Sequence, residues 1–172
     1  LQVAKGESVW GLATHGGTVL YLCLEDNFTR IQNRLFQITD DAPETLHFAT
    51  IAAGLYSGLQ EQLTNFLAQH PDTSLVVIDT FQRIRDGNDT GPPYASDYRD
   101  VTALKAIADK HSISLLLVHH TRKQQADDPM DKISGTTGIS GAADNNFVLE
   151  AHKRGCSEAT LACMGRDIEH ME

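Results

Sequence analysis

The sequence has few cysteines, no long apolar run and no excess of positive charge. Its three cysteines form no C-x-x-C pair, so no disulfide framework is predicted and the set suits a reducing cytosol. No apolar run approaches the roughly eighteen residues that cross a membrane. The first residues, LQVAKGESVW, lack the long apolar core of a signal peptide. These absences predict a cytoplasmic protein.

Positive charge is scarce as well, since the formal net charge is −9 at pH 7. An acidic chain of this kind does not favour nucleic-acid binding over its whole surface, so any such site must be a local patch. The candidate patch is the polar loop 121–138, with Arg122, Lys123 and Lys132 as its cations. Aspartates in the same loop dilute their charge, which makes the electrostatic signal for nucleic acid thin.

What the chain does have is an alternation of apolar runs and amphipathic segments, within a length that suits a single domain over residues 1–172. The predicted strands are 19–24, 45–50, 74–80 and 114–121, and the predicted helices are 27–38, 58–71 and 97–112. Asn27 is the expected N-cap of the first helix. A short helix in GISGAADNNF and a β-hairpin that turns at Lys153–Ser157 follow. This order predicts an α/β fold, a mostly parallel sheet flanked by helices with a C-terminal β-hairpin.

Polar residues follow three of the predicted buried strands. The first ends at Glu25–Asp26, another at Asp79–Thr80 and the third at His119–His120. The carboxyl ends of parallel strands meet at one edge of the sheet, where open α/β folds bind their ligands. We therefore expect these side chains to converge on one site.

The run LVVIDT has the Walker B pattern, in which a buried strand presents one carboxylate to a hydrated Mg²⁺ on nucleotide phosphates. In this interpretation Asp79 and Thr80 serve the Mg²⁺·nucleotide, and Glu25 acts as the general base that polarises the attacking water. The alternative is that these acids cap turns and helices, and Asp26 fits that role at the start of the helix from Asn27.

The other candidates each have two interpretations. His119 and His120 either sense a γ-phosphate or are ordinary polar residues at a strand end, and no third ligand supports zinc. Lys153 and Arg154 at the hairpin tip, or Arg166, either reach a neighbouring subunit's phosphate as a finger or are surface cations. For Arg166 the expected surface partners are Asp167 and Glu169.

Several segments together resemble the RepA-like hexameric replicative helicases, which are RecA/DnaB-type AAA ATPases of plasmids and phages. The segments are AKGESVWG, TVLYLCLEDNFTRIQNRL, LVVIDTFQRI, LLLVHHTRK, SGTTGISGAADNNFVLE and ATLACMGRDIE. The resemblance implies a RecA-like core that uses ATP and Mg²⁺, forms a homo-oligomeric ring and moves on single-stranded DNA. It implies Glu25 as catalytic glutamate, Asp79 as Walker B aspartate, and His119 or His120 as sensor, with His120 favoured. It also implies the loops 86–96 and 121–138 as DNA-contacting pore loops, and Lys153 and Arg154 as the trans-acting finger.

One part of the family pattern is missing, because the chain contains no Gly-Lys dipeptide and hence no G-x-x-x-x-G-K-[ST] loop. The expected explanation is truncation, with the first strand and the phosphate-binding loop lying before Leu1, so that the chain alone binds ATP poorly and does not hydrolyse it. Two other functions stay open. One is a RecA- or RadA-like recombination ATPase that forms filaments, and the other is a non-catalytic interaction module.

Overall fold

The computed structural model describes residues 1–85, 87, 91–122, 128–151 and 158–166. The predicted sites Lys123, Lys153 and Arg154, and the predicted hairpin turn, lie outside these residues. The described chain forms two compact units. Unit 1 comprises Leu1–Asn88 and Leu104–Val118, and unit 2 comprises Asp89–Ala103 and His119–Glu172.

The centre of unit 1 is a four-stranded sheet in the order β2-β1-β3-β4, counted over the described residues. Its strands are β1 (Thr18–Cys23), β2 (Leu46–Ala49), β3 (Thr73–Asp79) and β4 (Ser114–Val118). All three pairings are parallel. The predicted parallel sheet is confirmed, and β1 and β3, which carry the two acidic ends, are direct neighbours.

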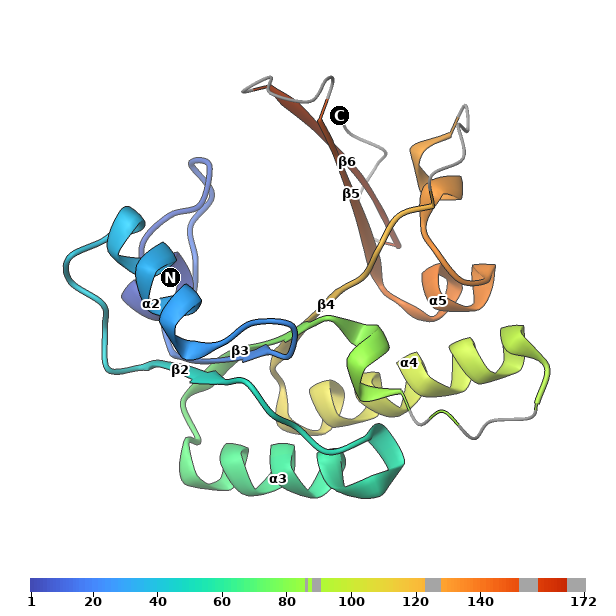
Figure 1. Cartoon of the computed structure of the whole chain (residues 1–172), viewed down its shortest axis with the longest axis horizontal. Coiled ribbons are helices and arrows are strands. Elements are labelled where there is room, and N and C mark those ends of the chain that lie inside the picture. Colours follow the sequence, from blue (N-terminus) through green and yellow to red (C-terminus); the bar gives the residue numbers. More distant parts are fainter. Residues whose placement is uncertain (86, 88–90, 123–127, 152–157, 167–172) are drawn as a thin grey trace. The chain divides into compact units, whose positions relative to one another are not determined.

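Helices cover both sides of this sheet. They are α1 (Gln2–Lys5), α2 (Phe28–Ile38), α3 (Gln60–Gln69) and the part of α4 (Pro93–His111) from Leu104 onward, with helical turns η1 (Leu55–Leu59) and η2 (Phe81–Ile84). In Figure 1, α2 and α3 lie on opposite sides of the strands. The buried core includes Leu63 and Leu67 of α3 and Val76 and Ile78 of β3, and each such side chain contributes about 1.5–3 kcal/mol of burial free energy. Across the described residues, no helix is long and apolar enough to cross a membrane.

Three details of unit 1 differ from the sequence-based predictions. The strand at 114–121 ends at Val118, so both histidines follow it, and its Leu116 is 44% exposed because β4 is an edge strand of the sheet. Helix α4 begins at Pro93 rather than at 97, since proline suits the first turn of a helix. This takes the end of the predicted loop 86–96 into the helix. On α2, Ile31 is buried, whereas Phe28 and Ile38 of the same predicted apolar face are exposed.

Unit 2 contains α4 up to Ala103, the turn η3 (Pro129–Lys132), α5 (Thr137–Ala142), and the antiparallel strands β5 (Asn145–Ala151) and β6 (Ala159–Gly165). The predicted short helix and hairpin are therefore confirmed. Met130, Val148 and Ala162 form its small core. Gly138 in α5 lies against the α4 backbone, where an added Cβ would be 2.6 Å from the Tyr94 carbonyl oxygen. This close approach requires glycine.

Candidate functional site

The carboxyl ends of β1 and β3 place the predicted acids side by side. Cys23 pairs with Asp79 in the sheet register, and the next amide, of Leu24, donates to the Asp79 carbonyl at 2.7 Å. One residue further, the Thr80 hydroxyl donates to Glu25 Oε1 at 3.1 Å. Glu25, Asp79 and Thr80 thus meet at one sheet edge.

The chain after β3 is held in place at this edge. Phe81 and Ile84 of η2 are fully buried, which fixes the turn directly after Thr80. The Arg83 guanidinium donates through Nε to the Leu24 carbonyl at 3.3 Å, and so ties this turn to the end of β1. The peptide bond between Asp79 and Thr80 is cis. Thr80 is buried while Glu25 is exposed, so Thr80 anchors a carboxylate that solvent and ligands can reach.

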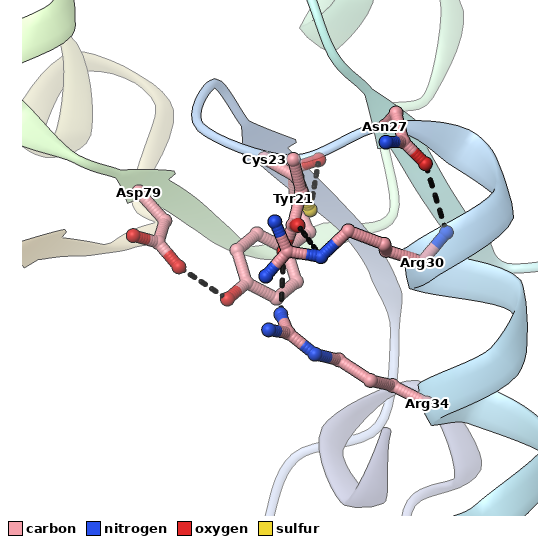
Figure 2. Close-up of polar contacts among 7 residues, drawn as sticks. Tyr21, Cys23, Asn27, Arg30, Arg34 and Asp79 are labelled. Carbon is pink, nitrogen blue, oxygen red and sulfur yellow. Dashed lines mark hydrogen bonds and ion pairs between the residues drawn. The ribbon is translucent and has the colours of Figure 1, made fainter.

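Asp79 has a second partner, which the sequence did not reveal. The Tyr21 hydroxyl donates to Asp79 Oδ2 at 2.7 Å, and Figure 2 shows the two side chains pointing toward each other from β1 and β3. Burial, followed by the hydrogen bond and charge of Asp79, raises the pKa of the Tyr21 phenol above its ordinary value. Burial and then the charges of Asp79 and Asp26 raise the pKa of the Cys23 thiol to about 12, so Cys23 stays a neutral thiol at physiological pH.

Asp26, unlike Glu25, is tied to helix α2. It pairs with Arg30 Nε at 3.0 Å and also with Arg34, and both arginines extend from α2 in Figure 2. The predicted N-cap is confirmed, since the Asn27 side chain accepts from the Arg30 amide at 3.0 Å. The adjacent acids therefore have different partners, Asp26 on the helix and Glu25 on the residue that follows Asp79.

The two histidines belong to unit 2 and contact the far end of the polar loop. His119 Nε2 lies 3.1 Å from the Ser134 carbonyl oxygen, and the Ser134 amide donates to the His120 carbonyl at 3.1 Å. A β-bridge between Thr121 and Ile133 closes the same segment. A histidine that bonds to a loop carbonyl is connected to that loop. The sensor role of either histidine stays a prediction.

The predicted DNA-binding and finger cations that the structure describes already have partners. Arg122 donates to the Gly135 carbonyl oxygen, and Lys132 Nζ contacts both carboxylate oxygens of Glu150 at 2.8 Å. Arg166 Nη1 is 3.6 Å from Asp144, in place of the expected partners Asp167 and Glu169, which lie outside the described residues. Lys132 is thus neutralised by a partner from β5, which weakens it as a phosphate ligand.

The donor set at the sheet edge suits magnesium. Within the described parts of the chain, no group of three or more His, Cys, Asp or Glu side chains could hold a metal ion. Mg²⁺ needs no such cage, because it keeps several waters and usually takes only one or two carboxylates together with substrate phosphates. The Asp79 carboxylate, with Oδ2 held by Tyr21, offers one such ligand.

Comparison with known proteins identifies the fold. A family described as "AAA domain" matches residues 1–126. The solved structure of a helicase ATPase domain superimposes with a TM-score of 0.68 at 12% identity and covers 90% of this chain and 69% of that one. The "RadB recombinase" structure gives a TM-score of 0.50 at 18% identity and covers 80% of this chain and 65% of that one, so the chain spans less than two thirds of RadB. Comparison with curated protein sequences gives no match. The shared fold is that of RecA-like ATPases.

Proposed function

Because the chain belongs to this AAA-domain family, we propose that it forms the ATP-hydrolysing core of a DNA helicase or translocase of plasmid or phage replication. The observation that carries the proposal is the contact of Glu25 with Thr80, beside Asp79, at the carboxyl ends of two neighbouring parallel strands. That edge is where open α/β sheets bind their ligands. A merely structural fold has no need of acidic and hydroxyl side chains gathered there.

In this proposal each residue of the edge has one task in hydrolysis. Asp79 binds Mg²⁺ through a water molecule, with Oδ2 fixed by Tyr21. Glu25 accepts a proton from the water that attacks the γ-phosphate, and Thr80 orients it through the hydrogen bond to Oε1. Mg²⁺, when bound with ATP, neutralises the charge that develops on the phosphate oxygens.

Movement on single-stranded DNA is the second part of the proposal. The loop 121–138 would contact the strand, and its end at Ser134 bonds to His119 and His120. A sensor histidine that responds to loss of the γ-phosphate would reposition this loop directly. Subunits would assemble as a hexameric ring in the cytoplasm, with Lys153, Arg154 or Arg166 reaching the neighbouring site.

The proposal is tested by comparing two proteins. One is the 172-residue chain, and the other is a loop-containing protein in which a strand and a G-x-x-x-x-G-K-[ST] loop precede it. We expect poor ATP binding and no turnover for the chain alone, since no Gly-Lys dipeptide is present to form the phosphate cradle. We expect Mg²⁺-dependent, DNA-stimulated phosphate release from the loop-containing protein. Micromolar ATP affinity and steady turnover by the chain alone would overturn the first expectation, and an inactive loop-containing protein would overturn the proposal.

Replacing Thr80 by valine tests how Glu25 is oriented. Valine keeps the volume of threonine but cannot donate to Glu25 Oε1. Loss of a hydrogen bond to a charged group costs roughly 1.5 kcal/mol, so we expect kcat of the loop-containing protein to fall about tenfold with KM for ATP little changed. Thr80→Ser retains the hydroxyl and should retain most of the activity. Equal loss in both variants would show that the hydroxyl is not what matters.

A recombination ATPase is a second candidate function, and the similarity to the RadB recombinase structure favours it. Both functions would use the same sheet edge for ATP. They differ in assembly, because a helicase of this kind forms a closed ring and a recombinase of this kind forms a filament. Electron microscopy of the loop-containing protein with ATP and single-stranded DNA distinguishes the two.

A further inference from the structure

We propose that Tyr21 is a positioning residue of the ATPase site, whose hydroxyl fixes the rotamer of Asp79 for binding Mg²⁺. This inference rests on the proposed function, because it assigns a task to a residue that touches Asp79 rather than the nucleotide. It extends that function to a side chain in the middle of β1, outside the group of polar residues at the strand ends.

The geometry of the contact is specific. Tyr21 lies on β1 and Asp79 on β3, and the sheet register pairs Tyr21 with Val77 and Cys23 with Asp79. The two residues are therefore diagonal neighbours on one face of the sheet. The phenol spans this offset, and its oxygen is 2.7 Å from Asp79 Oδ2, a short distance typical of a hydrogen bond to a carboxylate.

The ring that carries this hydroxyl is itself held. Tyr21 packs against Phe48 of β2, with ring centroids 6.0 Å apart at 34°. The hydroxyl thus approaches Asp79 from the β2 side of the sheet, anchored by a strand that makes no other contribution to the site. One carboxylate oxygen is occupied by this bond, which leaves Oδ1 as the oxygen for the metal-bound water.

A carboxylate fixed in this way binds a hydrated metal better than a free one. Outer partners of metal-binding side chains set their orientation, and removing such a partner typically costs about 10–100-fold in metal affinity or activity. The same logic applies when the carboxylate binds the metal through water, because the water's position follows the carboxylate rotamer. Tyr21 would therefore affect the Mg²⁺ requirement more than the affinity for ATP.

The test is Tyr21→Phe in the loop-containing protein, with Mg²⁺ titrated at saturating ATP. We expect the Mg²⁺ concentration for half-maximal hydrolysis to rise about tenfold, with ATP affinity measured without Mg²⁺ unchanged. Tyr56→Phe is the matched control, since it also removes one phenol hydroxyl, from a tyrosine on η1. Combining Tyr21→Phe with Asp79→Asn should add no further change in Mg²⁺ dependence, because the hydroxyl acts only through Asp79.

The outcomes separate this inference from the function on which it rests. If the unmodified loop-containing protein shows no Mg²⁺-dependent hydrolysis, the proposed function fails. If it hydrolyses ATP and Tyr21→Phe has the same Mg²⁺ dependence, the role of Tyr21 is wrong and the function stands. Should the phenylalanine variant not fold, 4-methylphenylalanine at position 21 fills the space of the hydroxyl without donating. It should give the same rise in Mg²⁺ requirement, and an unchanged requirement would contradict the inference.

Discussion

Glu25→Gln in the loop-containing protein should reduce kcat for ATP hydrolysis about 10³-fold while ATP binding stays within about threefold. Glutamine keeps the size of the side chain and can still accept the Thr80 hydrogen bond, which measures 3.1 Å in the native protein. It cannot take a proton from the attacking water, and general-base catalysis contributes roughly 10²–10⁴-fold to such a step. Single-turnover phosphate release and nucleotide titration measure the two quantities separately.

Glu44→Gln is the matched control for this experiment. Glu44 is an exposed glutamate just before β2, and the same loss of charge there should leave the hydrolysis rate unchanged. Hydrolysis at the native rate by Glu25→Gln would show that Glu25 is not the base. The contact with Thr80 would then be structural.

Phe81→Ala should have the largest effect on stability. Phe81 is fully buried directly after Thr80, and the Arg85 guanidinium lies 5.5 Å from the centre of its ring. Deleting a buried phenylalanine leaves a cavity and costs about 3–5 kcal/mol, which is a large part of the stability of a small domain. Urea denaturation followed by circular dichroism measures the free energy of unfolding.

The chain supplies its own comparison for this cavity. Phe36 on α2 is 62% exposed, so Phe36→Ala removes the same atoms from a position that is mostly in solvent. We expect a change within about 0.5 kcal/mol there. Similar losses in the two variants would mean that Phe81 is not part of the packed core, and that the η2 turn holds the end of β3 by other contacts.

The local features of the fold could be predicted from the sequence. The buried strands were evident as apolar runs, and the cap at Asn27 depends only on residues of its own helix. The pairing of β1 with β3 followed from the alternation of strands and helices, and this pairing brings Glu25 to Thr80. Patterns within a short window were sufficient for these features.

Features that depend on distant partners could not be predicted. The partner of Tyr21 is 58 residues away, so the strand pattern showed only an aromatic residue in an apolar run. The neutralisation of Lys132 depends in the same way on Glu150 of β5. The partial exposure of β4 was missed because burial depends on what lies beside a strand in the sheet, and an apolar run alone does not reveal an edge position. The early start of α4 was the exception, since the two prolines before Tyr94 signalled it.

The central claim is that the carboxyl ends of β1 and β3 hold the Mg²⁺·ATP that the protein hydrolyses. A crystal structure of the loop-containing protein with Mg²⁺ and a non-hydrolysable ATP analogue tests this most directly. The account predicts the metal joined to Asp79 through a water molecule, and a second water between Glu25 and the γ-phosphate. A nucleotide bound away from this edge, with Glu25 and Asp79 both far from its phosphates, would contradict it.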